Sequence, residues 1–169
     1  YIATSNGVSF YDGTTVKNQI YKTVNSITLS DVERIKFKGT KAYILANNLY
    51  TANIETFEDK GTASGFVNPV DIDFLSHDRL FLVDKGDSKV KTVDIESMEI
   101  ISDIETGDST QPVFILSNSI KSFVLNGGGL STQTKDSTVV VIEYRDDLVP
   151  LANFIGRLSV GDNPNSAVI

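Results

Sequence analysis

The sequence contains no cysteine, which excludes disulfide bonds, thiolate nucleophiles, iron–sulfur clusters and cysteine-type zinc sites together. It also contains no Asn-x-Ser/Thr glycosylation acceptor, and the two absences together favour a bacterial source. No apolar run approaches the roughly 18 residues that a membrane-spanning helix needs. The chain starts at Tyr1 without a signal-like apolar stretch, so we expect a mature, trimmed or excised piece of protein.

Basic residues are also scarce: 15 lysines and arginines stand against 22 aspartates and glutamates, a formal net charge of -7. A protein that binds duplex nucleic acid normally carries a basic face, because neutralising phosphates supplies most of its affinity. We therefore expect no nucleic-acid partner. The chain has 169 residues, 40% of them hydrophobic and 22% charged, which is typical of one globular domain with a sizeable core.

Helical periodicity is almost lacking as well. Short runs rich in Val, Ile, Phe and Tyr alternate with Gly, Asn, Asp, Ser and Thr, a pattern typical of all-β proteins. The runs include residues 19–24, which we expect to form a strand. Asn6-Gly7 predicts a type I′ hairpin turn, because both residues tolerate positive φ.

Three stretches repeat one pattern of strand, polar turn, strand and a final Asn or Asp, at residues 32–47, 69–84 and 112–126. A fourth copy of the first strand begins at Pro164. The connection after the second strand differs in length between the copies, and it is longest over residues 126–138. Repeat proteins tolerate such insertions at one position of a constant unit.

A unit of about 40–45 residues with four short antiparallel strands is typical of a β-propeller blade. The predicted fold is therefore all-β, a β-propeller of four-stranded antiparallel blades with about four blades in the chain. We expect one domain over residues 1–169, and we favour a segment of a larger ring over a self-closed protein. The expected blades are 1–25 (with 164–169 as a closing or next inner strand), 32–64, 69–107 and 112–160.

One family resemblance is carried by residues 65–112, most clearly by Val90-Lys-Thr-Val-Asp-Ile-Glu-Ser97 and by Phe81-Leu-Val-Asp84. These stretches resemble the surface-layer YVTN repeat family of β-propellers, with NHL-type and lactonase-like propellers as neighbours. The turns at 38–40 and 76–78 depart from the family's Pro-Asp-Gly pattern. The resemblance implies an extracytoplasmic binding or scaffold domain, without fixed catalytic residues.

The innermost strand of each expected blade supplies the candidate ligand-binding residues. Arg34 and Lys36 occupy this strand in one blade, and Asp71 and Asp73 occupy it in the next. Their side chains are expected to point toward a central channel. There they would either pair as opposite charges or line a ligand or metal site, as carboxylates and amides do in lactonase-like propellers.

Two further candidates lie in expected turns. Asp84-Lys-Gly-Asp87 offers oxygen ligands at a spacing that suits calcium, although Asp and Gly are also ordinary turn residues. His77 is the sole histidine and belongs to an expected hairpin turn rather than to a catalytic triad. We therefore predict no catalytic residue and no cofactor, with calcium at Asp84 and Asp87 as the alternative.

The sequence thus favours a non-catalytic binding or scaffold propeller in the periplasm, on the surface or outside a bacterial cell. The expected partner is a protein or glycan of the cell envelope, or the remainder of a larger propeller. Two alternatives remain open: a metal-dependent hydrolase of the lactonase type, and a purely structural repeat of a cell-surface protein. The fold does not decide between them, because propellers support many unrelated activities.

Overall fold

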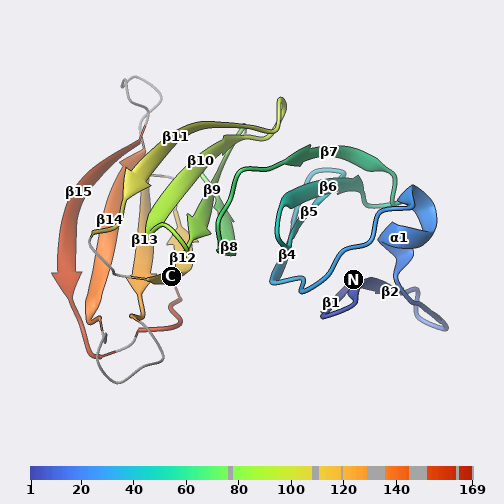
Figure 1. Cartoon of the computed structure of the whole chain (residues 1–169), viewed down its shortest axis with the longest axis horizontal. Helices are drawn as coiled ribbons and strands as arrows, with labels where there is room; N and C mark the ends of the chain where they lie inside the picture. Colours follow the sequence, from blue (N-terminus) through green and yellow to red (C-terminus); the bar gives the residue numbers. More distant parts are fainter. Residues whose placement is uncertain are drawn as a thin grey trace. The chain divides into compact units, whose positions relative to one another are not determined.

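The computed structural model describes residues 1–75, 78–107, 111–118, 120–128, 136–144, 152–162 and 164–168. The chain divides into two compact units, Tyr1–Phe66 and Val67–Ile169. The strands of every sheet are antiparallel, and each pairs with its neighbour in the sequence (Figure 1). Among the described residues, no helix is long and apolar enough to span a membrane.

The first unit contains a three-stranded sheet, a short helix and a four-stranded sheet. The small sheet has the order β1-β2-β3, and the larger has the order β4-β5-β6-β7. The elements are β1 (Ile2–Thr4), β2 (Gly7–Tyr11), β3 (Val16–Lys17), α1 (Ile20–Asn25), β4 (Arg34–Lys38), β5 (Lys41–Leu45), β6 (Leu49–Asn53) and β7 (Asp59–Ala63).

The second unit contains two four-stranded sheets, again with strands in sequence order. Their first strands, β8 and β12, run beside each other (Figure 1). The elements are β8 (Pro69–Phe74), β9 (Arg79–Asp84), β10 (Lys89–Asp94), β11 (Glu99–Glu105), β12 (Pro112–Ser117), β13 (Lys121–Asn126), β14 (Thr138–Tyr144) and β15 (Ala152–Ser159).

This architecture confirms the predicted fold class, a partial β-propeller of about four antiparallel blades. The middle strands of the four-stranded sheets, such as β5, β9 and β14, carry runs of consecutive buried apolar residues. Because successive side chains point to opposite faces, these runs give each of these sheets two apolar faces for packing against neighbouring sheets. In the second unit, one core joins the two sheets face to face. It includes Phe81, Val83 and Val90 from one sheet and Val124 and Ile142 from the other, all fully buried.

The core of the first unit is rich in aromatic residues. Tyr1, Phe10 and Phe57 form mutual ring contacts with centroids between 5.1 and 5.6 Å apart. The Tyr1 hydroxyl also donates a hydrogen bond of 2.6 Å to the carbonyl oxygen of Ile54. These contacts tie the small N-terminal sheet to the four-stranded sheet of the same unit.

The strand predicted over residues 19–24 is wrong, because the chain forms the helix α1 (Ile20–Asn25) there. Ile20 and Tyr21 are both buried in the same core, whereas successive residues of a strand point to opposite faces. Asn25 then bonds across to the four-stranded sheet: its side chain donates to the Phe57 carbonyl and accepts from the Asp59 amide. These tertiary contacts outweigh the local strand pattern.

The type I′ turn predicted at Asn6-Gly7 is also wrong, although the hairpin itself forms. Thr4 pairs with Gly7, so the two turn residues are Ser5 and Asn6. Of these residues only Gly7 has a positive φ, at 119°. The Thr4 hydroxyl accepts the Asn6 amide and donates to the Gly7 carbonyl, which stabilises this alternative turn.

Candidate functional site

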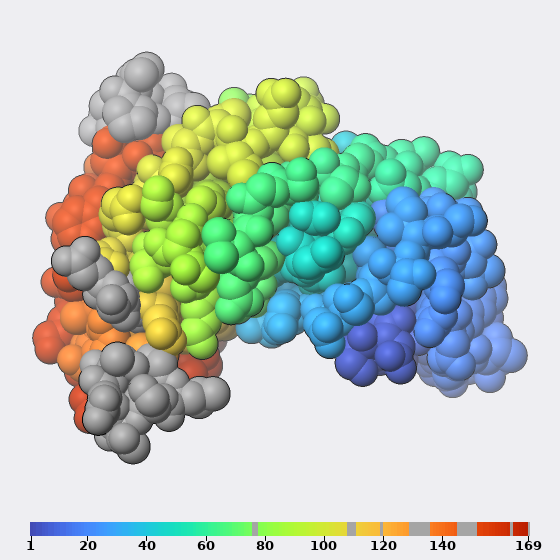
Figure 2. Space-filling model, in the orientation of Figure 1, coloured from blue at the N-terminus to red at the C-terminus, as the bar shows by residue number. Residues whose placement is uncertain are grey.

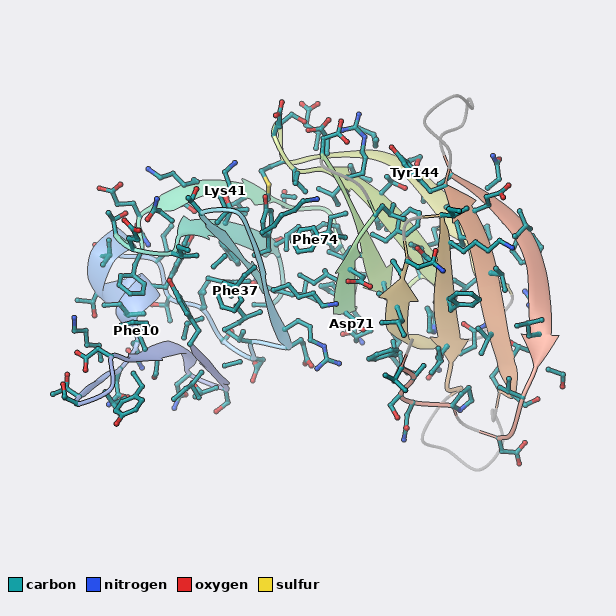
Figure 3. All side chains as sticks on the ribbon, turned by 180° about the vertical axis from the view of Figure 1, so that it is seen from behind. Phe10, Phe37, Lys41, Asp71, Phe74 and Tyr144 are labelled. Atoms are coloured by element: carbon teal, nitrogen blue, oxygen red, sulfur yellow. The ribbon has the colours of Figure 1, made fainter. Side chains whose placement is uncertain are left out.

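The two candidate carboxylates on β8 bind the backbone of the neighbouring sheet. Asp71 is 1% exposed, and its Oδ2 accepts the amide of Ile115 at 2.9 Å. Asp73 Oδ2 accepts the amide of Ser117 at 2.6 Å, and its Oδ1 accepts the amide of Phe74 at 3.0 Å. Figure 3 shows Asp71 beside the first strands of both sheets.

This arrangement has a simple origin in the strand geometry. Asp71 and Asp73 are two residues apart on β8 and therefore project from the same side of the strand. Ile115 and Ser117 are likewise two apart on β12, an edge strand whose outward amides have no ladder partner. Each carboxylate satisfies one of these amides, and bonds to a charged acceptor are stronger than neutral ones. We call the two bonds the carboxylate clamp.

The equivalent positions in the other sheets carry different chemistry. Arg34 and Lys36 lie two residues apart on β4 in the first unit, with Arg34 exposed and Lys36 half-buried. Phe114 and Leu116 hold the corresponding places on β12. The cationic pair and the carboxylate pair thus belong to different units, and their charge pairing stays a prediction.

Asp84, the first residue of the predicted calcium loop, is fully buried at the end of β9. Its carboxylate accepts three backbone amides: Val67 and Asn68, each at 2.8 Å, and Gly86 at 3.2 Å. These bonds fix the segment that enters β8 to the turn that leaves β9. A side chain at Gly86 would collide with Val67, since a Cβ there would lie 2.5 Å from its Cγ1.

Asp87 takes part in a separate network of charges. Its Oδ2 binds the Nζ of Lys91, whose side chain is only 9% exposed. Lys89 binds Asp103 at 2.8 Å and Glu105 at 3.2 Å, and Lys91 lies 3.8 Å from Asp103. Asp84 and Asp87 therefore serve different partners, and the described residues contain no cluster of three or more acidic or histidine side chains suited to a metal ion.

This network of charges shifts the pKa values of two of its members, Asp103 and Lys89. The hydrogen bond from Lys89, assisted by its charge, lowers the pKa of Asp103, while Asp103 and Glu105 raise the pKa of Lys89. We call Lys89, Lys91, Asp103 and Glu105 the ion ladder, because the register pairs Lys89 with Glu105 and Lys91 with Asp103 across β10 and β11. The sequence analysis missed it, although two like charges at every second residue of each strand are a readable signal.

Two predicted features lie outside the described residues. His77 is one of them, and most of the connection over residues 126–138 is the other; only its ends are described. At the beginning of that connection, Gly127 donates its amide to the carbonyl oxygen of Gln111 at 3.3 Å.

An apolar hollow lies on the face of the β12–β15 sheet that points away from the core. Its volume is about 420 Å³, and residues 164–168 form part of its wall. A second hollow of about 330 Å³ shares Phe123 with it. The lining of the larger hollow is Leu116, Phe123, Leu125, Val139, Val160, Pro164, Ser166, Ala167 and Val168.

No protein-family model matches the chain, and no curated protein matches it. Solved structures do resemble it. Kuenenia stuttgartiensis hydrazine synthase is 18% identical with a TM-score of 0.65, over 90% of this chain and 40% of the other. A functionally unknown protein from Desulfotomaculum acetoxidans is 12% identical with a TM-score of 0.60, over 80% of this chain and 44% of the other.

A candidate 6-phosphogluconolactonase from Bacteroides fragilis is 10% identical with a TM-score of 0.57, over 77% of this chain and 43% of the other. The chain thus spans less than half the length of these neighbours. Identities this low show the fold alone, and the fold that they share with this chain is propeller-like.

Proposed function

We propose that this chain is a non-catalytic part of a β-propeller that acts as a binding scaffold outside the cytoplasm of a bacterium. Its partner is a protein or glycan of the cell envelope, bound by the loops that connect the strands. One observation carries the proposal: the carboxylates on which an enzymatic reading depends are bound to backbone amides. Asp71 and Asp73 join two sheets, and Asp84 fixes the entry to β8.

The electronic argument is that a carboxylate can act as a metal ligand only with accessible lone pairs. Two carboxylate oxygens offer about four acceptor sites, and the Asp84 carboxylate already accepts three amides. Asp71 is almost fully buried, so a cation would have to displace the Ile115 amide to reach the bonded oxygen. Such displacement would leave a buried amide unpaired, which costs about 1–3 kcal/mol.

The sequence and the connecting loops support the proposed compartment and partner. The lack of cysteine and of glycosylation acceptors favours a bacterial source. The resemblance to the surface-layer YVTN family favours a location outside the cytoplasm. A rigid sheet scaffold with loops of unequal length suits recognition, because loops on such scaffolds commonly carry binding residues. An antibody against the chain should find it in the envelope or medium fractions of the source cells; finding it in the cytosol would contradict this part of the proposal.

A calcium titration tests the non-catalytic assignment. We expect no saturable heat on adding millimolar calcium in isothermal titration, and equal melting temperatures in calcium and in EDTA. We also expect Asp71→Asn to lower the melting temperature in both buffers, because the clamp is structural. The exposed Glu55 provides the matched control Glu55→Gln, for which we expect an unchanged melting temperature.

The opposite outcome is equally clear. A saturable calcium shift that Asp71→Asn or Asp73→Asn abolishes, together with hydrolysis of a lactone such as 6-phosphogluconolactone, would overturn the scaffold assignment. The lactonase-type alternative would then replace it. A ligand that binds only the folded protein raises its stability by mass action, so the melting experiment detects an ion site even without turnover.

A further inference from the structure

Strand register relates the two sheets of the second unit residue by residue. In the first of them, Val90 pairs with Val83 on one side and with Ile104 on the other. In the last sheet, Val139 occupies the equivalent place, where it pairs with Leu125 on one side and with Leu158 on the other. The equivalent pairs are Phe81 and Phe123, Val83 and Leu125, Val90 and Val139, and Ile104 and Leu158.

The first member of each pair belongs to a covered face. Phe81, Val83 and Val90 are fully buried, and Ile104 is 7% exposed. All four belong to the core that the second unit's two sheets share. Residues of the last sheet, among them Ile115 on its first strand, supply the cover. This covered face is therefore an inter-blade face whose partner is visible.

The second members form what we call the outer apolar face: Phe123, Leu125, Val139 and Leu158. No four-stranded sheet among the described residues of the second unit covers it. Leu158 is 50% exposed, and the two hollows open on this face beside Phe123. In Figure 2 the atoms of β15, drawn in red, form the margin of this unit. The pattern of an inter-blade face is thus repeated, but here only Leu125 and Val139 are buried, while Phe123 and Leu158 stay partly exposed.

Residues 164–168 indicate how a cover would begin. The sequence Gly161-Asp-Asn-Pro164 resembles the Gly-to-Pro segments that lead into β8 and β12. Three residues after the proline stand Ile72 in β8, Ile115 in β12 and Ala167 here. Ala167 lines the hollow on the outer apolar face, where it holds the sequence position that Ile115 holds on the covered face.

We propose that the outer apolar face is an inter-blade face and that its occupant is a further four-stranded β-blade, whose first strand follows the path of residues 164–168. The register equivalence specifies the occupant, because the same four positions in the preceding sheet pack against a blade. The length of the structural neighbours agrees with it, since this chain covers only 40–44% of them. This proposal does not depend on the function proposed above.

The chain's own last blade provides a direct test. Replacing residues 164–169 by a second copy of residues 112–169 puts the copy's first proline at the position of Pro164. The appended blade then carries the same inner residues that cover Phe81 and Val83. We expect the extended chain to melt at least about 5 °C higher, which corresponds to roughly 2 kcal/mol in a chain of this size. We also expect slower amide exchange at Leu125 and Val139.

Leu158 and Phe154 form a matched pair for the specificity of this contact. Both lie on β15, and they are 50% and 48% exposed. Leu158 pairs with Val139 on the outer apolar face, whereas Phe154 pairs with Ile142, whose side chain is in the core of the opposite face. In the extended chain, Leu158→Asp in the original blade should remove the gain in melting temperature, and Phe154→Asp should leave most of it.

Other results would overturn the proposal. One is an extended chain whose amides on β13 and β14 exchange as fast as in the 169-residue chain. This result must hold both for the blade copied from residues 112–169 and for a second version that appends a copy of residues 69–107. Another is a 169-residue chain that forms a dimer in analytical ultracentrifugation and loses it on Leu158→Asp, because a second copy would then be the occupant. Equal effects of Leu158→Asp and Phe154→Asp would also contradict a face-specific contact.

Discussion

The covered face of the β8–β11 sheet and the outer apolar face of the β12–β15 sheet are built from matching residues and differ in exposure. Val90 is fully buried on the first, and its equivalent Val139 is 8% exposed on the second. The largest contrast is at the last strands, where Ile104 is 7% exposed and Leu158 is 50% exposed. The exposure of these side chains therefore depends on whether another sheet packs against the face, and not on the residue type.

The two faces also differ in their polar contacts. The carboxylate clamp secures the covered interface from β8, through Asp71 and Asp73. At the equivalent positions of β12 stand Phe114 and Leu116, which have no carboxylate to offer a following strand. A contact on the outer apolar face would therefore lack a carboxylate clamp from β12 and would use the apolar packing of Phe123, Leu125 and Leu158. Such packing is non-directional, whereas the clamp also fixes the relative register of two first strands.

The largest effect that separates the two faces should come from truncating the equivalent phenylalanines. Phe81→Ala removes a fully buried ring and should destabilise the chain by about 3–5 kcal/mol. Phe123→Ala removes a half-buried ring next to an existing hollow and should cost about 1–2 kcal/mol. Urea unfolding followed by circular dichroism measures both values.

Equal losses for the two phenylalanine variants would show that the outer apolar face is already covered in the 169-residue chain. Unchanged m-values for both variants would confirm that the comparison concerns stability alone, because m reports the surface exposed on unfolding.

A medium effect should follow from breaking the carboxylate clamp. Asp71→Ala leaves the buried amide of Ile115 without this acceptor and should cost about 1–3 kcal/mol. Asp71→Asn keeps one acceptor oxygen and should cost less than Asp71→Ala. The matched control is Phe114→Leu on β12, which changes the equivalent position without touching the clamp.

Amide exchange provides the readout that distinguishes the clamp from general packing. The amide of Ile115 should exchange faster in Asp71→Ala at conditions where the rest of β12 stays protected. If its exchange rate is unchanged, the carboxylate does not hold that amide in solution.

The sequence predicted four-stranded blades because a strand pattern is local: short apolar runs and the turn residues that bound them are read within about ten residues. It failed at α1, where the deciding contacts of Asn25 are with Phe57 and Asp59, more than 30 positions away. It failed at the first turn because the Thr4 hydroxyl, and not the Asn-Gly pair, sets the geometry.

The candidate site shows the same limit. The sequence placed Asp71 and Asp73 on a first strand, but their amide partners are 44 residues further along the chain and belong to another blade. A side chain's strand can be predicted from a pattern, while its partner depends on tertiary packing. The ion ladder differs, because its charges alternate within β10 and within β11, so the amino-acid sequence alone carries the signal for it.

The smallest expected effect concerns this ladder, which has no counterpart in the last sheet: the position of Lys91 is taken there by Val140, a core residue paired with Arg157. Asp103 has a pKa below its ordinary value because Lys89 donates a hydrogen bond to it. A carboxyl group with a lowered folded-state pKa stabilises the folded state above its unfolded pKa of about 3.9, and this contribution is lost as the pH falls through the folded value.

Asp103→Asn should therefore cost less than about 1 kcal/mol near neutral pH, because the Asp103 side chain is 42% exposed and solvent screens the pair. The loss should shrink in about 1 M salt, where the Debye length is about 3 Å, and it should vanish at a pH below the folded-state pKa. Urea unfolding of the two proteins across this pH range measures the difference. If the loss of stability is the same at every pH, it comes from the packing of the Asp103 side chain and not from its charge. The ion ladder would then contribute no electrostatic stability to this blade.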